Sequence, residues 1–192
     1  MTVDIRPLKM RMRKEAKEYR LSLSAEEKER NDRKIANKLL NLWTFRDADT
    51  LLAYMSTDIE VDTLYLIERA WELGKKVAVP RCIAGTRNMV FHYISSFDDL
   101  ESGSFGVMEP IADKCPTLVV SDKCICVVPA LVFDKKCFRL GYGKGYYDRF
   151  LASFSGTAVG ICYESCRKDS VPHGKFDKSL DLFITENRIY TP

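Results

Sequence analysis

Short apolar runs alternate along this chain with segments of helical periodicity, and this alternation restricts the fold more than any other feature. The runs that predict buried strands occupy residues 50–55, 76–80, 90–94, 124–131, 157–163 and 181–185. Helices are predicted between several of them, one from Asp62 to Gly74 and another from near Gly145. Buried strands that alternate with helices form a layered α/β fold around a mostly parallel sheet. No repeat or linker interrupts the pattern, so we expect one domain over residues 1–192.

Two helices are predicted before the first strand. The apolar stripe of the first helix consists of residues three or four positions apart: Leu8, Met12, Ala16, Tyr19 and Leu23. The basic residues of this helix are expected off that stripe: Lys9, Arg11, Arg13, Lys14, Lys17 and Arg20. Ser24 and Glu27 have the spacing of a capping box, which predicts the start of a second helix. The inner side of the second helix carries Ile35, Leu39 and Leu42.

Charge and hydropathy exclude several classes of protein. The net charge is +3, and the first 34 residues hold 11 Lys and Arg against 7 Asp and Glu, so the rest is close to neutral. This distribution indicates a local anion site or a solvated helix face, and not a nucleic-acid surface across the domain. No apolar run is long enough to cross a bilayer, and the N-terminal residues lack the apolar core of a secretory signal. We therefore expect a cytoplasmic protein.

The cysteines and histidines do not predict a metal centre or a catalytic triad. The seven cysteines include no C-x-x-C pair, and the chain has two histidines. Cys124 and Cys126 lie on one face of a predicted strand, and Cys137 lies in a polar loop. We interpret all three as small packing residues, although a functional thiol at Cys137 is the alternative.

A glycine-rich loop after the longest apolar run is the candidate ligand site, because ligands of parallel α/β sheets bind beyond the carboxyl ends of strands. Residues 141–145 read G-Y-G-K-G, and glycines permit positive φ and leave backbone N–H groups accessible to an anion. The N-terminus of the following helix adds positive potential. Arg139 and Lys144 supply cations, and Asp148 is placed to hold a metal ion. The combination predicts a phosphate site, although the pattern is neither a Walker A nor a Rossmann loop.

The stretch R-L-G-Y-G-K-G-Y-Y-D at residues 139–148 resembles the signature of the 5-formyltetrahydrofolate cyclo-ligase family. Five shorter motifs accompany it in the order typical of the family: Lys9 and Arg13 as K-x-x-x-R, 58–63 as the E-x-D-T segment, 74–81 as G-K-x-V-x-x-P-R, 106–110 as G-x-x-E-P, and 171–185 as V-P…D…T-E. The chain departs from the family at Ala130, Cys137 and Lys144, where glycine is usual or frequent. Cysteine adopts positive φ with difficulty, so the departure at Cys137 concerns the geometry of the turn.

The resemblance implies a three-layer α/β domain related to the sugar-phosphate isomerase and CoA-transferase group. It implies ATP-dependent cyclisation of 5-formyltetrahydrofolate to 5,10-methenyltetrahydrofolate, with release of ADP and phosphate. The γ-phosphoryl group of ATP is transferred to the formyl oxygen, N10 closes the ring, and phosphate leaves. Mg²⁺ is the implied metal. ATP and 5-formyltetrahydrofolate are the implied partners, and we expect no nucleic acid, no membrane, and a monomer or weak homodimer.

The resemblance also implies roles for particular residues. Catalytic roles fall to Lys9, Arg139 and Lys144. The residues implied to bind ATP are Lys9, Met10, Arg11, Met12, Arg13, Arg139, Leu140, Gly141, Tyr142, Gly143, Lys144, Gly145, Tyr146 and Tyr147. Those implied to bind the folate are Met55, Glu60, Tyr142, Gly143, Lys144, Gly145 and Tyr146, with the two tyrosines as ring-stacking partners. Asp148 and Asp177 are the implied metal ligands, and Asp181 competes with Asp177 for this role.

Alternatives remain open for the residues and for the function. From the residues alone, Lys9 and Arg13 are interpreted as a solvated helix face, Met55 as a packing residue and Asp177 as a turn residue. A nucleic-acid-binding module would use the basic first helix, although no known binding signature is present. A similar fold also carries sugar-phosphate isomerases and acyl-CoA transferases. The latter need a nucleophilic carboxylate, for which Glu109 is the candidate, and dependence on ATP distinguishes these cases.

Overall fold

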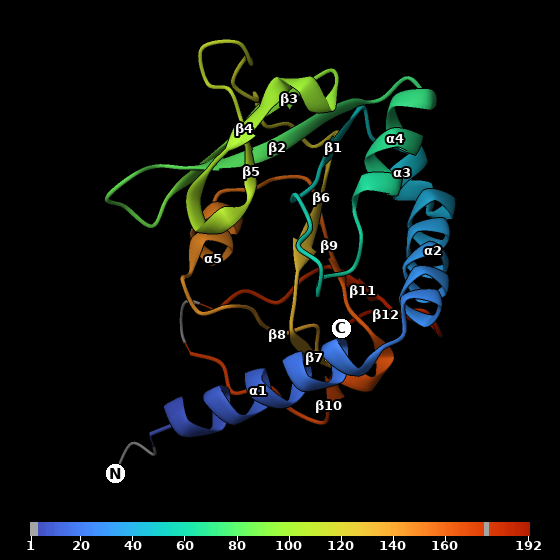
Figure 1. Cartoon of the computed structure of the whole chain (residues 1–192), viewed down its shortest axis with the longest axis vertical. Coiled ribbons are helices and arrows are strands. Elements are labelled where there is room, and N and C mark those ends of the chain that lie inside the picture. Colours follow the sequence, from blue (N-terminus) through green and yellow to red (C-terminus); the bar gives the residue numbers. More distant parts are fainter. Residues whose placement is uncertain (1–3, 175–176) are drawn as a thin grey trace.

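A seven-stranded sheet forms the centre of the molecule in the computed structural model, which describes residues 4–174 and 177–192 (Figure 1). In spatial order its strands are β12 (Ile189–Tyr190), β11 (Leu182–Ile184), β9 (Thr157–Ile161), β6 (Cys124–Pro129), β1 (Thr50–Leu52), β2 (Lys76–Cys82) and β3 (Met89–Ile94). The five inner strands are parallel, and β12 and β3 pair antiparallel at the two edges. The predicted α/β fold with a mostly parallel sheet is confirmed. Residues 1–3, and residues 175–176 of the motif at 171–185, lie outside the described residues.

Helices on both sides of the sheet complete three layers. On one side lie α2 (Ala25–Asn41), α3 (Trp43–Asp47) and α4 (Leu64–Glu72); on the other lie α5 (Tyr146–Leu151) and the hairpin of β4 (Leu100–Ser102) and β5 (Met108–Pro110) (Figure 1). A three-stranded sheet of β10 (Arg167–Lys168), β7 (Val132–Asp134) and β8 (Arg139–Leu140) lies beside α1 (Arg6–Ser22), which crosses one end of the large sheet (Figure 1). Short 3₁₀ helices are η1 (Phe97–Asp99), η2 (Ser104–Gly106) and η3 (Glu164–Cys166). No helix within the described ranges has the length and apolar character needed to span a bilayer.

The second helix begins where the capping pattern predicts. Ser24 Oγ accepts a hydrogen bond from the Glu27 amide at 3.1 Å, which satisfies one of the free donors at the helix start. Ile35 and Leu39 are fully buried against the core, as predicted. Leu42 follows the last helical residue and is half-buried, so the inner face of α2 is one residue shorter than the apolar pattern indicates.

The first helix is held in place by a buried cation, and this part of the prediction was wrong. Arg20 was expected off the packed face of α1, but the residue is only 4% exposed. Its Nη2 donates to the carbonyl of Ala130 at 2.5 Å and contacts Cys162 Sγ at 3.4 Å, while Nη1 donates to the carbonyl of Ile59 at 3.3 Å. These acceptors follow β6, β9 and β1, so one guanidinium joins α1 to the carboxyl ends of three adjacent strands.

Two of the predicted strands end earlier than their apolar runs, because their backbone groups find other partners. The run at 50–55 pairs only as far as Leu52, and the carbonyl of Tyr54 then accepts a bond from Thr63 Oγ1 at 2.5 Å. The run at 124–131 ends as a strand at Pro129, after which Arg20 binds the free carbonyl of Ala130. Both segments stay buried after they leave the sheet, which explains why hydropathy alone overestimates their length.

Cys137 occupies the positive-φ position that the family comparison indicated. Its φ is 59°, in the left-handed region where glycine is favoured, and its side chain is fully buried. Burial, with a further contribution from the nearby Asp134 carboxylate, raises the pKa of its thiol to about 11. The thiol therefore remains protonated at neutral pH. This geometry agrees with a packing role for Cys137, as interpreted from the sequence.

We predict that Gly160→Ala destabilises the fold. A Cβ on Gly160 of β9 would lie 2.2 Å from Cε1 of Phe183, which is fully buried and stacks on Phe133 with ring centres 4.5 Å apart. Overpacking of a tight core costs about 1–3 kcal/mol, to be measured as the free energy of unfolding in urea. Gly141→Ala is the control, because no atom lies within 4 Å of its added Cβ. Equal stability of the two variants would contradict the prediction.

Candidate active site

A large cavity opens at the carboxyl ends of the inner strands, where the parallel fold predicts a ligand site. Its volume is about 990 Å³, at the upper end of the roughly 300–1,000 Å³ typical of small-molecule sites. The lining is mostly apolar and comes mainly from α1, the segment after β1, the end of β2, the β4–β5 hairpin and residues 139–148, with Met89 and Pro129 added from β3 and β6. Asp177 adds a carboxylate from the C-terminal part of the chain.

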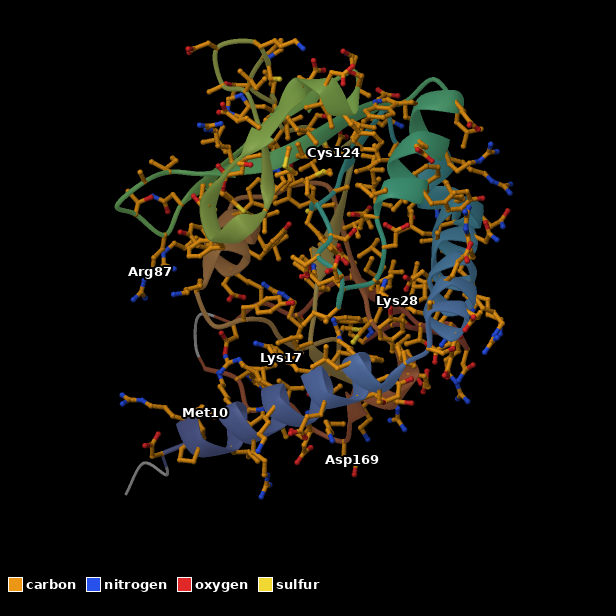
Figure 2. All side chains as sticks on the ribbon, viewed as in Figure 1. Met10, Lys17, Lys28, Arg87, Cys124 and Asp169 are labelled. Atoms are coloured by element: carbon orange, nitrogen blue, oxygen red, sulfur yellow. The ribbon has the colours of Figure 1, made fainter. Side chains whose placement is uncertain are left out.

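One face of α1 brings positive charge to this cavity. Lys9 Nζ lies 3.2 Å from Asp177 Oδ2, and Arg13 Nε donates to the carbonyl of Gly141 at 2.8 Å. Partial burial lowers the pKa of Arg13, which still leaves this strongly basic group charged at neutral pH. Lys17 continues the same side of the helix and places its ammonium 5.3 Å from the ring centre of Tyr142 (Figure 2). α1 therefore contacts the glycine-rich loop through Arg13 and Lys17, about one turn apart.

The structure brings only part of the predicted segment of α1 into the cavity. Lys9, Met10 and Arg13 line it, whereas Arg11 and Met12 do not. The exposed Arg11 lies on the outer face, with Nε 3.7 Å from Glu15, and Met12 packs against the core. Residues of a helix share a face only at spacings of three or four, so a continuous five-residue segment cannot point to one ligand.

The glycine-rich loop has the backbone geometry that the sequence predicted. Gly143 and Gly145 have φ of 92° and 76°, and the loop leads directly into α5 at Tyr146. A Cβ on Gly143 would lie 2.9 Å from Arg13 Nη2, so glycine is also required there by the close approach of α1. α5 has only six residues, and its dipole is a smaller source of positive potential than the sequence interpretation assumed. The backbone amides and the neighbouring cations are thus the main anion-binding groups.

Of the carboxylates that line the cavity, the two predicted metal ligands, Asp148 and Asp177, are each paired with a cation. Asp148 Oδ1 accepts from Arg139 Nη2 at 3.0 Å, and Asp177 Oδ2 accepts from Lys9 and from the amide of Gly174 at 2.8 Å. Asp181 has a different role, because its Oδ2 accepts from the backbone amide of Ala158 at 2.7 Å, outside the cavity lining. The geometry therefore favours Asp177 over Asp181 as the second cavity carboxylate.

These two carboxylates are compatible with a magnesium ion that is shared with a nucleotide. In the described part of the chain, no group of three or more His, Cys, Asp or Glu side chains is arranged to hold a metal by itself. Mg²⁺ does not require such a group, because it keeps several waters and binds through one or two carboxylates and substrate phosphates. Asp148 and Asp177 supply that number of oxygen ligands in a cavity that also contains phosphate-binding groups.

The predicted folate residues lie around the same cavity. Met55 and Glu60 are buried, and Glu60 Oε2 accepts from both the amide and the hydroxyl of Thr57 at 2.9 Å. Burial, and then the nearby Glu60 carboxylate, raise the pKa of Tyr142 to about 12. The Tyr147 hydroxyl is buried and has no hydrogen-bond partner among the described residues. A ligand in the cavity can supply the missing partner.

Other lining residues were not predicted. Arg6, Cys82, Phe105 and Met108 all contribute to the lining. Helical spacing was the available signal for Arg6, which lies three positions before Lys9. Cys82 lies beyond the end of the strand predicted at 76–80, and no sequence signal identified Phe105 and Met108 because the strands of their hairpin have only three residues each.

Comparisons with known proteins agree with the resemblance found in the sequence. A sequence profile of the 5-formyltetrahydrofolate cyclo-ligase family matches residues 6–186. The chain is 28% identical over 181 residues to the 5-formyltetrahydrofolate cyclo-ligase of Haemophilus influenzae, covering 92% of this chain and 97% of the relative. It is 30% identical over 179 residues to that of Mycoplasma pneumoniae, covering 91% and 96%. The solved structure of Aquifex aeolicus 5,10-methenyltetrahydrofolate synthetase superposes with a TM-score of 0.82 at 29% identity, covering 96% of this chain and 92% of that one.

We predict that Gly143→Ala weakens nucleotide binding. The new methyl group meets both an unfavourable φ and the Arg13 guanidinium, so it displaces Arg13 from the loop. We expect the dissociation constant of a non-hydrolysable ATP analogue to rise about tenfold or more, equivalent to about 1.4 kcal/mol. Gly74→Ala is the matched control, because its φ is 73° but no atom lies within 4 Å of its Cβ. Equal affinity in both variants would show that Gly143 does not shape the anion site.

Proposed function

This chain belongs to the 5-formyltetrahydrofolate cyclo-ligase family, and we propose that it converts 5-formyltetrahydrofolate into 5,10-methenyltetrahydrofolate with hydrolysis of ATP to ADP and phosphate. The observation that carries the proposal is the convergence of two sets of groups on one cavity. Cations and glycine amides suited to phosphates lie on one part of its wall, and buried apolar and carboxylate groups suited to a folate lie on another.

The chemistry explains why such a reaction needs ATP. The carbon of a formamide is a poor electrophile, and its oxygen is a poor leaving group. In the proposed sequence the formyl oxygen attacks the γ-phosphorus of ATP, and ADP leaves. N10 then attacks the formyl carbon, its proton is released, and the C–O bond breaks as phosphate departs. The protein has to align the two substrates and neutralise the phosphates, which are the main tasks in enzymatic phosphoryl transfer.

The proposed nucleotide half of the site uses α1 and the glycine-rich loop. Lys9 and Lys144 offer ammonium groups, and Arg139 offers a guanidinium, at the cavity wall. Arg13 is already bound to the carbonyl of Gly141, so it fixes the loop in the shape that receives the phosphates. We assign the catalytic roles to Lys9, Arg139 and Lys144, since their charges are placed to stabilise the transferring phosphoryl group.

In the nucleotide complex, Asp148 and Asp177 would hold Mg²⁺, which neutralises phosphate charge when bound. Their present partners, Arg139 and Lys9, lie 3.0 Å and 3.2 Å from them. Exchange of partners would free both cations for phosphate oxygens. The ion pairs therefore keep these charges balanced and close to the positions where they act.

The proposed folate half of the site combines the buried Met55 and Glu60 with the more exposed rings of Tyr142 and Tyr146. Met55 provides apolar surface, and Glu60 provides an acceptor for N–H groups of the substrate. Tyr142 and Tyr146 offer rings for stacking, with Tyr146 also donating to the carbonyl of Thr86 at 3.3 Å. The Tyr147 hydroxyl, which burial keeps neutral by raising its pKa, offers a further donor.

The alternative functions receive less support. On α1, Lys9 and Arg13 face the cavity, whereas the outward Arg11 and Lys14 each lie 3.7 Å from a glutamate one turn away. This arrangement leaves less free positive charge on the outer face than a nucleic-acid module would use. A cytoplasmic location and a monomeric or weakly dimeric state stay predictions.

The direct test combines the purified protein with 5-formyltetrahydrofolate, ATP and Mg²⁺, and follows the near-ultraviolet absorbance of the conjugated methenyl product. We expect product only when ATP and the metal are both present, because formamide activation requires phosphoryl transfer. Omission of ATP and addition of EDTA are the controls. If the folded protein binds ATP but forms no product, the proposed nucleotide site is supported and the cyclo-ligase assignment is contradicted.

A further inference from the structure

Glu109 places a second buried carboxylate in the cavity, on the β4–β5 hairpin. It lies in the middle of β5, is 5% exposed, and lines the cavity. Its Oε1 accepts from the amide of Cys82 at 3.2 Å, which fixes the carboxylate against the end of β2. The hairpin leaves space for it at Gly103, where a Cβ would come within 2.3 Å of Glu109 Cγ. The fold therefore holds this carboxylate in a defined position.

Unlike Asp148 and Asp177, Glu109 has no cationic partner. Among the described residues, no Lys, Arg or His nitrogen lies within 4.0 Å of it, and its donors are the amide and the thiol of Cys82, with Arg81 as a more distant positive charge. The adjacent Arg81 is engaged elsewhere, since its Nη1 donates to Glu101 and to the carbonyl of Pro110, both at 2.6 Å. A buried carboxylate without a compensating charge or a full set of donors is costly. A ligand with N–H donors would remove that cost.

The surroundings of Glu109 favour a flat, uncharged ligand group with donors on one edge. Pro80, Met89 and Met108 contribute apolar lining at this part of the cavity. Burial, and then the Glu109 carboxylate itself, raise the pKa of the Cys82 thiol, so this neighbour stays neutral. Phosphate groups and the glutamate tail of a folate are anionic, and both would be repelled by Glu109.

We propose that Glu109 binds the 2-amino and N3–H edge of the pterin ring, an inference that rests on the proposed cyclo-ligase function. These two groups are adjacent N–H donors on one side of a planar ring, and a carboxylate accepts such a pair through its two oxygens. Adenine is a poorer match, because its amino group is flanked by ring nitrogens that accept hydrogen bonds. Glu109 would thus act as a specificity residue that orients the pterin, with the formyl group directed to the phosphate-binding part of the cavity.

The experiment measures equilibrium binding of 5-formyltetrahydrofolate, without ATP, to the wild type, Glu109→Gln and Glu109→Ala. We expect Glu109→Ala to raise the dissociation constant about ten- to hundredfold, and Glu109→Gln to raise it less, because the amide keeps one acceptor. The affinity for a non-hydrolysable ATP analogue should change less than about twofold. Glu68→Gln is the matched control, because Glu68 is exposed on α4 and lies outside the cavity lining.

A substrate analogue in which a methyl group replaces the 2-amino group isolates the proposed contact. The wild type should bind the analogue about tenfold or more weakly than the natural compound, and Glu109→Ala should bind both about equally. The proposal is overturned if Glu109→Ala weakens binding of both compounds by the same factor. It is also overturned if this variant loses affinity for the nucleotide and not for the folate. Thermal unfolding checks that each variant is folded. If Glu109→Ala does not fold, the isosteric Glu109→Gln is used for the same comparison. Binding is read without turnover, so a failure of the cyclo-ligase assignment appears separately in the product assay.

Discussion

The buried guanidinium of Arg20 is the interaction on which the rest of the site depends. It joins α1 to two backbone carbonyls that follow β1 and β6 and to the Cys162 thiol that follows β9, three neighbours in the central sheet. Removing a buried, multiply bonded cation of this kind from its partners is strongly destabilising, so the contact fixes the position of the helix. Lys9 lies about 16 Å further along the same helix at 1.5 Å per residue. The placement of Lys9 and Arg13 at the cavity therefore follows from a contact that is itself outside the cavity lining.

Charge pairing in the cavity serves preorganisation more than stability. The pairs Lys9–Asp177 and Arg139–Asp148 join residues distant in sequence, or in different elements, and are partly exposed. The more exposed pair, Lys9–Asp177, contributes little to the free energy of unfolding, whereas the Arg139 side chain of the other pair is only 6% exposed. Their value lies in holding cations and metal-binding oxygens near one another before the ligands arrive, which lowers the cost of assembling the reactive complex. Glu109 differs because no cation pairs with it among the described residues, which is the basis for assigning it to a ligand.

Much of the fold could be predicted from the sequence, because its inner strands are continuous apolar runs and α1, α2 and α4 have clear helical periodicity. The β4–β5 hairpin and the small sheet at β7 and β8 could not, since strands of two or three residues have no readable period. The burial of Arg20 was not predicted, because a charged side chain is expected to be exposed unless its partners are known. Two of its partners are backbone carbonyls, which the sequence does not identify. The sequence also could not decide between Asp177 and Asp181 as the second metal ligand. That choice depends on the hydrogen bond that Asp181 accepts from the Ala158 amide.

The most direct test of this account replaces Arg20, which touches no proposed ligand, with lysine and measures the affinity for a non-hydrolysable ATP analogue. Lysine keeps the charge but cannot reach three strand ends from one planar group. The account predicts a five- to thirtyfold weaker affinity, equivalent to about 1–2 kcal/mol, together with faster amide hydrogen exchange in α1. Faster exchange in α1 with unchanged nucleotide affinity would contradict the claim that the docking of this helix builds the phosphate-binding half of the site.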